Sequence, residues 1–187
     1  MSQYNPKYVK KILFDTQQLY AAIKKAAIWA TKKFKNDRLP PVFLCLLKGA
    51  LPFYSTLIMN IDCDIITDFM VVSSFRGQIT KQTKPQIITD ILADIKNRNV
   101  IICDDVIDSG ETLSFLKRYL TKKGAKNVYV MVLADKPKCH KVNIKADYAC
   151  FIIKNKAFLI GYGLDINEKA RNLPYLAEFD KKYLHEI

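Results

Sequence analysis

Three acidic side chains lie close together near the middle of this 187-residue sequence, at Asp104, Asp105 and Asp108. Neighbouring carboxylates can bind Mg²⁺, directly or through water, and they can accept hydrogen bonds from the hydroxyl groups of a sugar. Asp108 also opens the segment 108–112, Asp-Ser-Gly-Glu-Thr, which is rich in small and hydroxyl-bearing residues. The spacing therefore indicates a site for a metal ion, a sugar, or both.

The segment 108–112 has the composition of a phosphate-binding loop. Ser109 and Thr112 add hydroxyl donors, Gly110 lets the backbone approach a ligand closely, and free N–H groups at a helix start attract an anion. The segment contains no Gly-Lys-Ser or Gly-Lys-Thr, so it is not the loop that binds nucleoside triphosphates. Phosphate, hydroxyl groups and metal together suggest a phosphorylated ribose. The alternative is an ordinary strand, turn and helix in which Asp108 is the N-cap.

Hydrophobic periodicity predicts the elements that position these residues. The run 100–103 is apolar and β-branched except for Cys103, which is typical of a strand buried on both faces. After the loop, Leu113, Leu116 and Leu120 recur at helical spacing. The central motif is therefore predicted to be a buried strand, an acidic pair, a loop and a helix.

The same reasoning extends along the chain. Asp15 can act as an N-cap, with Gln18 three residues later, for a helix that ends near Phe34. We further expect strands at 42–47, 63–75, 86–90, 127–134, 148–153 and 157–162, and a second helix at 51–59. Strands that alternate with helices predict an α/β fold with a central parallel sheet, in a single domain that spans residues 1–187. Residues 1–14 give no clear pattern.

Candidate ligand-binding groups follow several of these strands. Lys48 and Gly49 follow one and Lys136 follows another, and ligands of such sheets bind beyond the carboxyl ends of the strands. The alternatives are an exposed lysine in a tight turn for Lys48, and a surface lysine before Pro137 for Lys136. The polar stretch 76–85 is long for a connection and predicts a functional hairpin loop over the edge of the sheet.

Composition narrows the class of protein. No apolar run is long enough to span a bilayer and the first residues lack a signal-peptide core, so we expect a cytoplasmic protein with no membrane partner. The net charge is +12, but the lysines are scattered, which favours a solvated basic surface over a nucleic-acid interface. The five cysteines form no C-x-x-C pair and the two histidines show no ligand spacing, so we expect reduced cysteines and no structural zinc.

With these motifs laid out, the chain resembles the type I phosphoribosyltransferases, and in particular their bacterial hypoxanthine-guanine branch. The resemblance covers about residues 40–176. It rests on five stretches in order: Leu46-Leu-Lys-Gly-Ala50, Ser73-Ser-Phe75, the run 100–112, Leu133-Ala-Asp-Lys-Pro137, and 158–165 with Arg171. The resemblance implies a central parallel sheet flanked by helices, a small hood, and a flexible lid hairpin at 73–86.

The resemblance also implies an activity and a role for each candidate residue. The family joins a purine to phosphoribosyl pyrophosphate (PRPP) and releases pyrophosphate, which gives IMP or GMP from hypoxanthine or guanine. Asp108, Ser109, Gly110, Glu111 and Thr112 would hold the 5′-phosphate, and Asp108 would also be the general acid or base at purine N7. Asp104 and Asp105 would face the ribose and Mg²⁺. Pyrophosphate would meet Lys48, Gly49, Ser74 and Arg171, and the purine would meet Lys136, Phe158, Leu159 and Asp165, of which Asp165 would bind a second Mg²⁺.

Some residues depart from the family pattern. The usual Glu-Asp pair is Asp104-Asp105 here, Glu111 adds negative charge beside the phosphate, and Phe75 replaces the usual lid tyrosine.

Rival interpretations are a nucleic-acid-binding regulator that senses PRPP, and a phosphoribosyltransferase for adenine, xanthine or orotate. Lys136 and the 158–165 motif argue against the regulator, which would not need purine contacts. The family precedent suggests a homodimer or homotetramer, and we expect no nucleic-acid partner.

Overall fold

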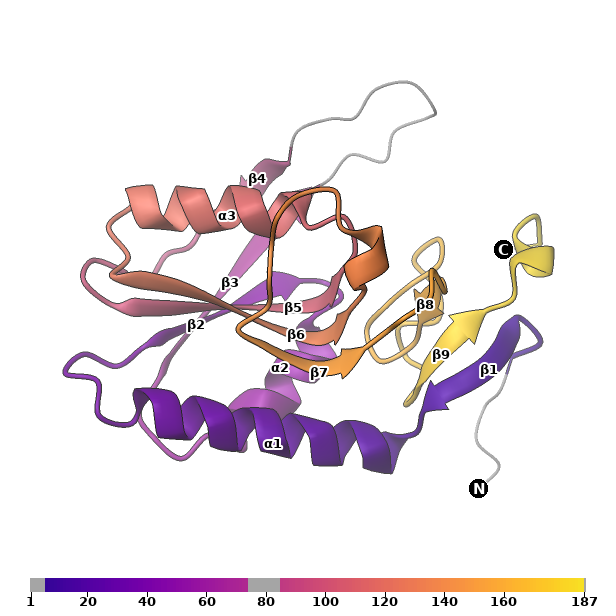
Figure 1. The fold of residues 1–187 in the computed structure, drawn as a ribbon, viewed down its shortest axis with the longest axis horizontal. Helices are drawn as coiled ribbons and strands as arrows, with labels where there is room; N and C mark the ends of the chain where they lie inside the picture. Colours follow the sequence, from indigo (N-terminus) through magenta and orange to yellow (C-terminus); the bar gives the residue numbers. More distant parts are fainter. Residues whose placement is uncertain (1–5, 74–84, 187) are drawn as a thin grey trace.

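The computed structural model describes residues 6–73 and 85–186, and its largest element is a six-stranded sheet (Figure 1). The strands lie in the order β4-β3-β2-β5-β6-β7. They are β2 (Val42–Leu47), β3 (Ile66–Ser73), β4 (Gln86–Thr89), β5 (Asn99–Ile107), β6 (Asn127–Asp135) and β7 (Tyr148–Ile152). Neighbours pair in parallel except β4, which pairs antiparallel with β3 at the edge. The predicted α/β fold with a central parallel sheet is confirmed.

Helices cover both faces of this sheet, because successive side chains of each strand point to opposite faces. Phe43 and Ile101 pack on the face covered by α1 (Thr16–Phe34) and α2 (Leu51–Ile58). Leu44 and Ile102, their sequence neighbours, pack on the face covered by α3 (Glu111–Lys122). Figure 1 shows the resulting layers, with α3 on one side of the strands and α1 on the other.

The start of α1 follows the predicted capping pattern. Asp15 Oδ1 accepts a hydrogen bond from the Gln18 N–H at 2.8 Å, and Gln18 Oε1 accepts one from the Asp15 N–H at 3.0 Å. Leu19, Ile23 and Ala30 are fully buried on one stripe of the helix. Replacement of an N-cap by alanine typically costs about 0.5–2 kcal/mol, so this reciprocal pair fixes where the helix begins.

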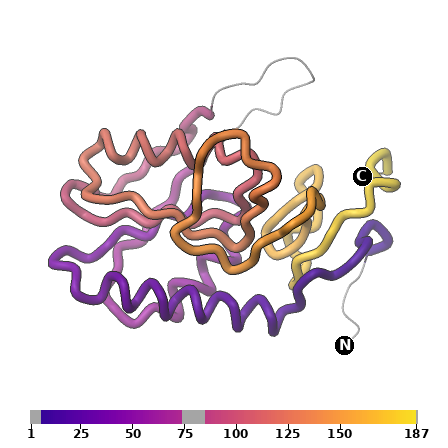
Figure 2. The backbone as a smooth tube through the Cα atoms, in the orientation of Figure 1, coloured from indigo at the N-terminus to yellow at the C-terminus, as the bar shows by residue number. Residues whose placement is uncertain are grey.

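A second sheet of three strands, in the order β1-β9-β8, joins the two ends of the chain. Its members are β1 (Val9–Phe14), β8 (Leu159–Ile160) and β9 (Leu176–Phe179), paired antiparallel. Figure 2 shows the indigo segment of β1 beside the yellow segment of β9. In Figure 1 this sheet stands beyond the carboxyl ends of β6 and β7. β1 was not predicted, because residues 1–14 show no clear pattern.

The central strand is longer than predicted. β5 continues to Ile107, so Asp104 and Asp105 lie within the strand rather than after it. The reason is that its two ladders end at different places: β2 pairs with β5 only as far as Cys103, whereas β6 pairs with it to Ile107. Beyond Cys103 the acidic pair therefore lies where β5 has left its ladder with β2.

Other predicted boundaries need smaller corrections. β3 begins at Ile66 rather than at residue 63, and β8 contains two residues only. Ser73 and Gln86 pair across the β3–β4 ladder, which confirms the arms of the hairpin. The proposed lid itself, with Ser74 and Phe75, lies outside the described residues.

All five cysteines are free, and none of the helices in the described ranges could cross a bilayer.

Candidate active site

The carboxyl ends of β5 and β6 bring Asp108 and Lys136 together. Ile107 pairs with Asp135 in the parallel ladder, so the residues that follow the two strands are neighbours. Lys136 Nζ donates to Asp108 Oδ1 at 2.9 Å, and the Lys136 N–H donates to the Ile107 carbonyl at 3.0 Å. Lys136 is buried, so the alternative of a surface lysine is wrong. An ammonium and a half-exposed carboxylate thus lie side by side at the edge of the sheet.

A second contact holds this strand end, and sequence reasoning missed it. His140 Nε2 lies 2.7 Å from Asp135 Oδ1, across the short 3₁₀ turn η1 (Pro137–Cys139), and both side chains are largely buried. The pair links the last residue of β6 to the end of the turn that follows Lys136. A spacing of five residues across a proline-led turn has no periodic signature, so only the folded chain reveals it.

The loop after β5 leads directly into α3 and leaves the start of that helix open. Its N-cap is Gly110, whose φ of 79° lies in the left-handed region that glycine adopts without strain. Gly110 has no side chain that could cap the helix, and Ser109 Oγ accepts the Glu111 N–H at 3.3 Å, which leaves the N–H groups of Thr112 and Leu113 for a ligand. The N-cap is therefore Gly110, and the alternative role of Asp108 as the N-cap is wrong. The backbone N–H groups of the first turn, next to Ser109 and Thr112, can point at an anion.

One flank of this loop is packed against residues 141–144. A Cβ on Gly110 would lie 2.4 Å from Ile144 Cγ2, and the Lys141 N–H donates to the Ser109 carbonyl at 2.9 Å. The segment thereby supports the loop from the side. Any side chain at position 110 would displace Ile144, so both the backbone conformation and the contact require glycine there.

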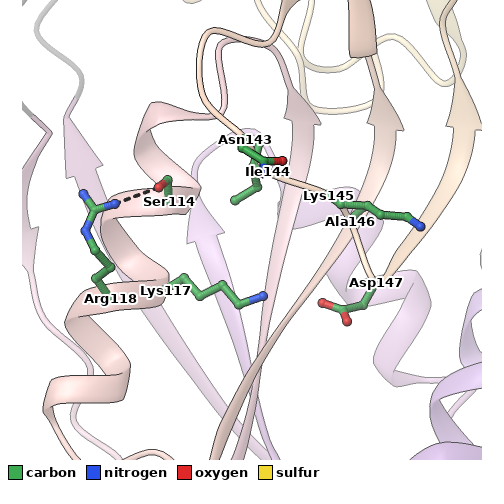
Figure 3. A pocket seen from close by; sticks show the side chains of 8 residues that line it. All are labelled: Ser114, Lys117, Arg118, Asn143, Ile144, Lys145, Ala146 and Asp147. Carbon is green, nitrogen blue, oxygen red and sulfur yellow. Dashed lines mark hydrogen bonds between the residues drawn. The ribbon is translucent and has the colours of Figure 1, made fainter.

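A surface hollow of about 480 Å³ lies further along α3, between that helix and residues 143–147 (Figure 3). Lys117 extends across it, whereas Arg118 points away and donates to Ser114 Oγ at 2.8 Å, and the Lys145 ammonium is directed away as well. The basic groups do not converge on one point. None of the lining residues is a predicted site residue, so this hollow is separate from the predicted site.

The acidic pair of β5 lies against the turn that follows β2. A Cβ on Gly49 would be 1.9 Å from Asp105 Oδ2, so a larger residue cannot stand there without moving the carboxylate. A Cβ on Gly163 would be 2.0 Å from the Gly49 carbonyl oxygen, which shows how closely the loop 161–165 approaches the same turn. The turn at Gly49 therefore lies in close contact with both Asp105 of β5 and the loop after β8.

The surroundings of Asp104 and Asp105 disfavour the ionised form of both carboxyl groups. Burial raises the pKa of Asp104 well above its usual range, and the charge of Asp105 raises it further. Burial also raises the pKa of Asp105, although hydrogen bonds from the Asp104 side chain and the Val106 N–H, and the charge of Arg171, act in the opposite direction. Two neighbouring half-buried carboxylates would be stabilised in their ionised form by a cation.

Lys48 and Arg171 meet in one ionic cluster with Asp165 and Glu168. Lys48 Nζ lies 2.8 Å from Glu168 Oε2, and Arg171 Nη2 lies 3.0 Å from both Glu168 Oε1 and Asp165 Oδ1. Arg171 Nη1 also donates to the Gly163 carbonyl at 2.9 Å. The structure therefore brings together two residues predicted to bind pyrophosphate and one predicted to bind metal. It adds Glu168, which the sequence did not indicate.

Leu159 is the first residue of β8 in the smaller sheet, and Phe158 directly precedes it. The half-buried ring of Phe158 is 5.8 Å from that of Phe179, in an edge-to-face arrangement. The Phe158 carbonyl accepts the Phe179 N–H at 2.8 Å, and Ile160 pairs with Ala177. Because alternate residues of an antiparallel strand face its partner, the N–H and C=O of Leu159 point away from β9, toward the open edge of this sheet.

The predicted metal ligands do not form a closed metal site. Within the described ranges, no group of three or more His, Cys, Asp or Glu side chains could hold a metal ion. A carboxylate pair at Asp104 and Asp105, with Asp165 separate, is an all-oxygen donor set that leaves most positions to other ligands. Mg²⁺ is typically bound in this way, by one or two carboxylates with water and substrate phosphates completing its shell. The residues present fit that ion.

Residues 10–167 match the family described as the phosphoribosyl transferase domain. The hypoxanthine-guanine phosphoribosyltransferase of Streptococcus thermophilus (strain CNRZ 1066) is 40% identical over 170 residues, which cover 91% of this chain and 93% of that protein. That of Lactococcus lactis subsp. lactis (strain IL1403) is 39% identical over 170 residues, with 91% of each covered.

Solved structures agree with these relatives. A hypoxanthine phosphoribosyltransferase from Staphylococcus aureus superposes with a TM-score of 0.87 at 32% identity, over 94% of both chains. A hypoxanthine-guanine phosphoribosyltransferase from Bacillus anthracis superposes with a TM-score of 0.82 at 35% identity, over 91% of this chain and 98% of the other. Sequence match and shared fold agree over nearly the whole length: the chain belongs to the phosphoribosyltransferase family, among its hypoxanthine-guanine phosphoribosyltransferases.

Proposed function

We propose that this protein transfers the phosphoribosyl group from PRPP to hypoxanthine or guanine, which yields IMP or GMP and pyrophosphate. The observation that carries the proposal is the Lys136–Asp108 pair, whose ammonium and carboxylate lie 2.9 Å apart beside the open start of α3. The family membership gives the reaction class. The pair supports a 6-oxopurine as the base, because it places a hydrogen-bond donor, Lys136, beside an acceptor, Asp108.

The pair complements two neighbouring atoms of a 6-oxopurine. In the free base O6 accepts a hydrogen bond and the N7–H donates one. Lys136 carries only donors and would meet O6, whereas the Asp108 carboxylate would accept the N7 proton. Removal of that proton raises the electron density of the ring and makes N9 a better nucleophile toward C1′. The ring of Phe158 would stack on the base, and the outward-facing backbone of Leu159 would meet its pyrimidine edge.

The phosphoribosyl group would lie between the loop after β5 and the acidic pair. The first-turn N–H groups of α3 and the hydroxyls of Ser109 and Thr112 would hold the 5′-phosphate, while Gly110 keeps that surface free of a side chain. Asp104 and Asp105 would accept hydrogen bonds from the ribose hydroxyls. This placement points C1′ between the base pocket and the Lys48 cluster, where the bond to pyrophosphate breaks.

The departing pyrophosphate would meet Lys48, the backbone at Gly49, and Arg171, with Ser74 as a further proposed ligand. Bound Mg²⁺, held by Asp104 and Asp105 and a second ion by Asp165, would supply positive charge opposite the leaving group. Fixed cations aimed at developing negative charge stabilise the transition state more than the ground state. The C1′ centre becomes cation-like as the bond breaks, so the hairpin 73–86 is proposed to close over it and exclude water.

The test is a transfer assay on the full chain with PRPP and each of hypoxanthine, guanine, xanthine and adenine. We expect product from hypoxanthine and guanine and almost none from adenine, and we expect the rate to vanish in excess chelator and return with Mg²⁺. Adenine as the preferred base, or an unchanged rate in chelator, would contradict the proposal. We also propose a homodimer or homotetramer, which light scattering after size exclusion would distinguish from a monomer.

A further inference from the structure

Glu168 occupies the place where Lys48 and Arg171 converge. Each oxygen of its carboxylate binds a different cation, Oε2 to Lys48 Nζ at 2.8 Å and Oε1 to Arg171 Nη2 at 3.0 Å. The hydrogen bond from Lys48, and then that from Arg171, lower the pKa of the Glu168 carboxyl below its ordinary value, so it is ionised at neutral pH. An anion that bridges two cations in this way takes the positions that two phosphate oxygens would take.

The backbone holds Glu168 in this place by a turn with unusual conformations. Asn167, Glu168 and Ala170 all have positive φ, at 48°, 63° and 72°. The Glu168 N–H donates to Asp165 Oδ2 at 2.9 Å, and Ile166 and Lys169 bridge across the turn. Left-handed conformations cost free energy for residues other than glycine and persist only where the surrounding contacts enforce them. The turn therefore fixes the backbone of Glu168 at a position from which its side chain can reach both cations.

The local charge balance shows what this contact means for a ligand. Lys48 and Arg171 carry two positive charges, and Glu168 and Asp165 together cancel them. A pyrophosphate that approached this cluster as it stands would meet no net positive charge. The Glu168 side chain is 66% exposed, so it can rotate into water without disturbing the core and leave both cations to the ligand.

We propose that Glu168 is an internal competitor of pyrophosphate, whose carboxylate neutralises Lys48 and Arg171 in the ligand-free enzyme and must leave before PRPP or pyrophosphate can bind there. The inference rests on the proposed function, which places pyrophosphate at these two cations. The same exchange works in reverse after the reaction. When Glu168 returns to the cations, it takes over the contacts of the product, which favours its release.

The direction of a mutational effect separates this role from its opposite. If Glu168 merely positions Lys48 and Arg171 for the ligand, its loss should weaken pyrophosphate binding. If it competes, its loss should tighten binding. Exposed ion pairs are weak, so the expected gain from removing two of them is modest, about three- to tenfold in Kd.

The experiment is calorimetric titration of the full chain with pyrophosphate at saturating Mg²⁺, together with KM for PRPP and kcat for hypoxanthine transfer. In Glu168→Gln we expect Kd for pyrophosphate and KM for PRPP to fall about three- to tenfold, with no gain in kcat. Glu168→Asp keeps the charge but is one methylene too short to reach both cations, so its Kd should also fall. Glu186→Gln removes a carboxylate from an exposed pair with Lys7, outside the site, and should leave every value unchanged.

Each remaining outcome has a definite meaning. Unchanged or weaker pyrophosphate binding in Glu168→Gln overturns the inference, while hypoxanthine transfer by the native protein shows that the proposed function stands. The inference is also overturned if pyrophosphate binds more tightly to Glu168→Gln but not to Glu168→Asp. In that case the negative charge at position 168, and not its contact with both cations, would oppose the ligand. Failure of the native protein to bind pyrophosphate or to transfer hypoxanthine would instead count against the proposed function.

Discussion

Two lysine–carboxylate pairs in the candidate site have nearly the same length and opposite surroundings. Lys136 Nζ and Asp108 Oδ1 are 2.9 Å apart, and the lysine side chain is 10% exposed. Lys48 Nζ and Glu168 Oε2 are 2.8 Å apart, and both side chains are about two-thirds exposed. Distance therefore does not separate the two pairs, but burial does. On the proposals made above, the first pair is a fixed element that recognises the base and the second is an exchangeable contact.

The difference originates in how each pair is built. Asp108 and Lys136 directly follow neighbouring parallel strands, and the β5–β6 register sets their separation. Glu168 belongs to a loop with positive φ angles and reaches Lys48 across 120 residues of sequence. A buried ammonium must keep its partner, because an unpaired buried charge is costly. An exposed ammonium can exchange one anion for another at little cost.

The largest expected effect concerns base choice at the buried pair. Adenine would set a 6-amino donor against the donors of Lys136, and a site built around one hydrogen-bonding pattern can reject its mismatch by ~10⁴–10⁵. We therefore expect kcat/KM for hypoxanthine to exceed that for adenine by this order in the native protein. In Lys136→Met the ratio should collapse, mainly through loss of hypoxanthine activity. An unchanged ratio would show that Lys136 is not the reader of the 6-position.

The next effect concerns the carboxylate of the same pair. Asp108→Asn keeps the shape of the loop but cannot take the N7 proton, so we expect kcat to fall by ~10²–10⁴, the usual range for loss of a general acid or base. The Kd for PRPP should change little, because the backbone of the loop and the start of α3 would still hold the phosphate. Stopped-flow turnover with a separate PRPP titration measures both. Near-normal turnover would remove Asp108 from the chemistry.

Both members of the buried pair, Lys136 and Asp108, were predicted from the sequence as site residues. Of the exposed pair, Lys48 was predicted and Glu168 was not. Short apolar runs predicted parallel strands whose carboxyl ends lie at one edge of the sheet. Five candidate residues were therefore expected there: Asp104, Asp105, Asp108, Lys48 and Lys136. The detailed contact of Lys136 with Asp108 needed the register. Glu168 had no signal, because nothing in the letters Asp-Ile-Asn-Glu-Lys-Ala reveals positive φ at three positions apart from the tolerance of asparagine for that region.

Two strands of the smaller sheet, β1 and β9, were missed for a related reason, whereas β8 lies within the predicted strand 157–162. β1 reads Val-Lys-Lys-Ile-Leu-Phe, without the alternation of a half-buried strand, and its ladder with β9 has register shifts at two places. Its partner, β9, lies at the other end of the chain, so no local sequence pattern predicts this pairing. The longer β5 was missed because acidic residues argue against a strand, yet β6 continues to pair with them. Long-range pairing overrides local propensity in both cases.

A smaller effect is expected at the exposed pair. Lys48→Met should raise KM for PRPP roughly tenfold at low salt, because one exposed charge-assisted contact to pyrophosphate is lost, while kcat falls less. Salt should narrow the gap between this variant and the native protein, since the Debye length falls from about 10 Å at 0.1 M to about 3 Å at 1 M. The comparison with Lys136→Met sharpens the point. A gap at Lys48 that persists in high salt would mean that this lysine acts as a desolvated group.

The smallest expected effect is on folding stability, and it distinguishes the pairs without any substrate. Lys48→Met removes an exposed pair, and surface substitutions typically change stability by no more than about 0.5 kcal/mol, or roughly 1–2 °C in Tm for a chain of this size. Lys136→Met leaves the half-exposed Asp108 without its nearest cation but fills the buried space with a side chain of similar length. A lost partner of this kind costs about 1 kcal/mol or more, so Tm should fall by at least roughly 2–4 °C. Thermal unfolding of both variants beside the native protein measures the contrast. Equal shifts would mean that burial does not separate the two pairs, and the division into a fixed and an exchangeable contact would fail with it.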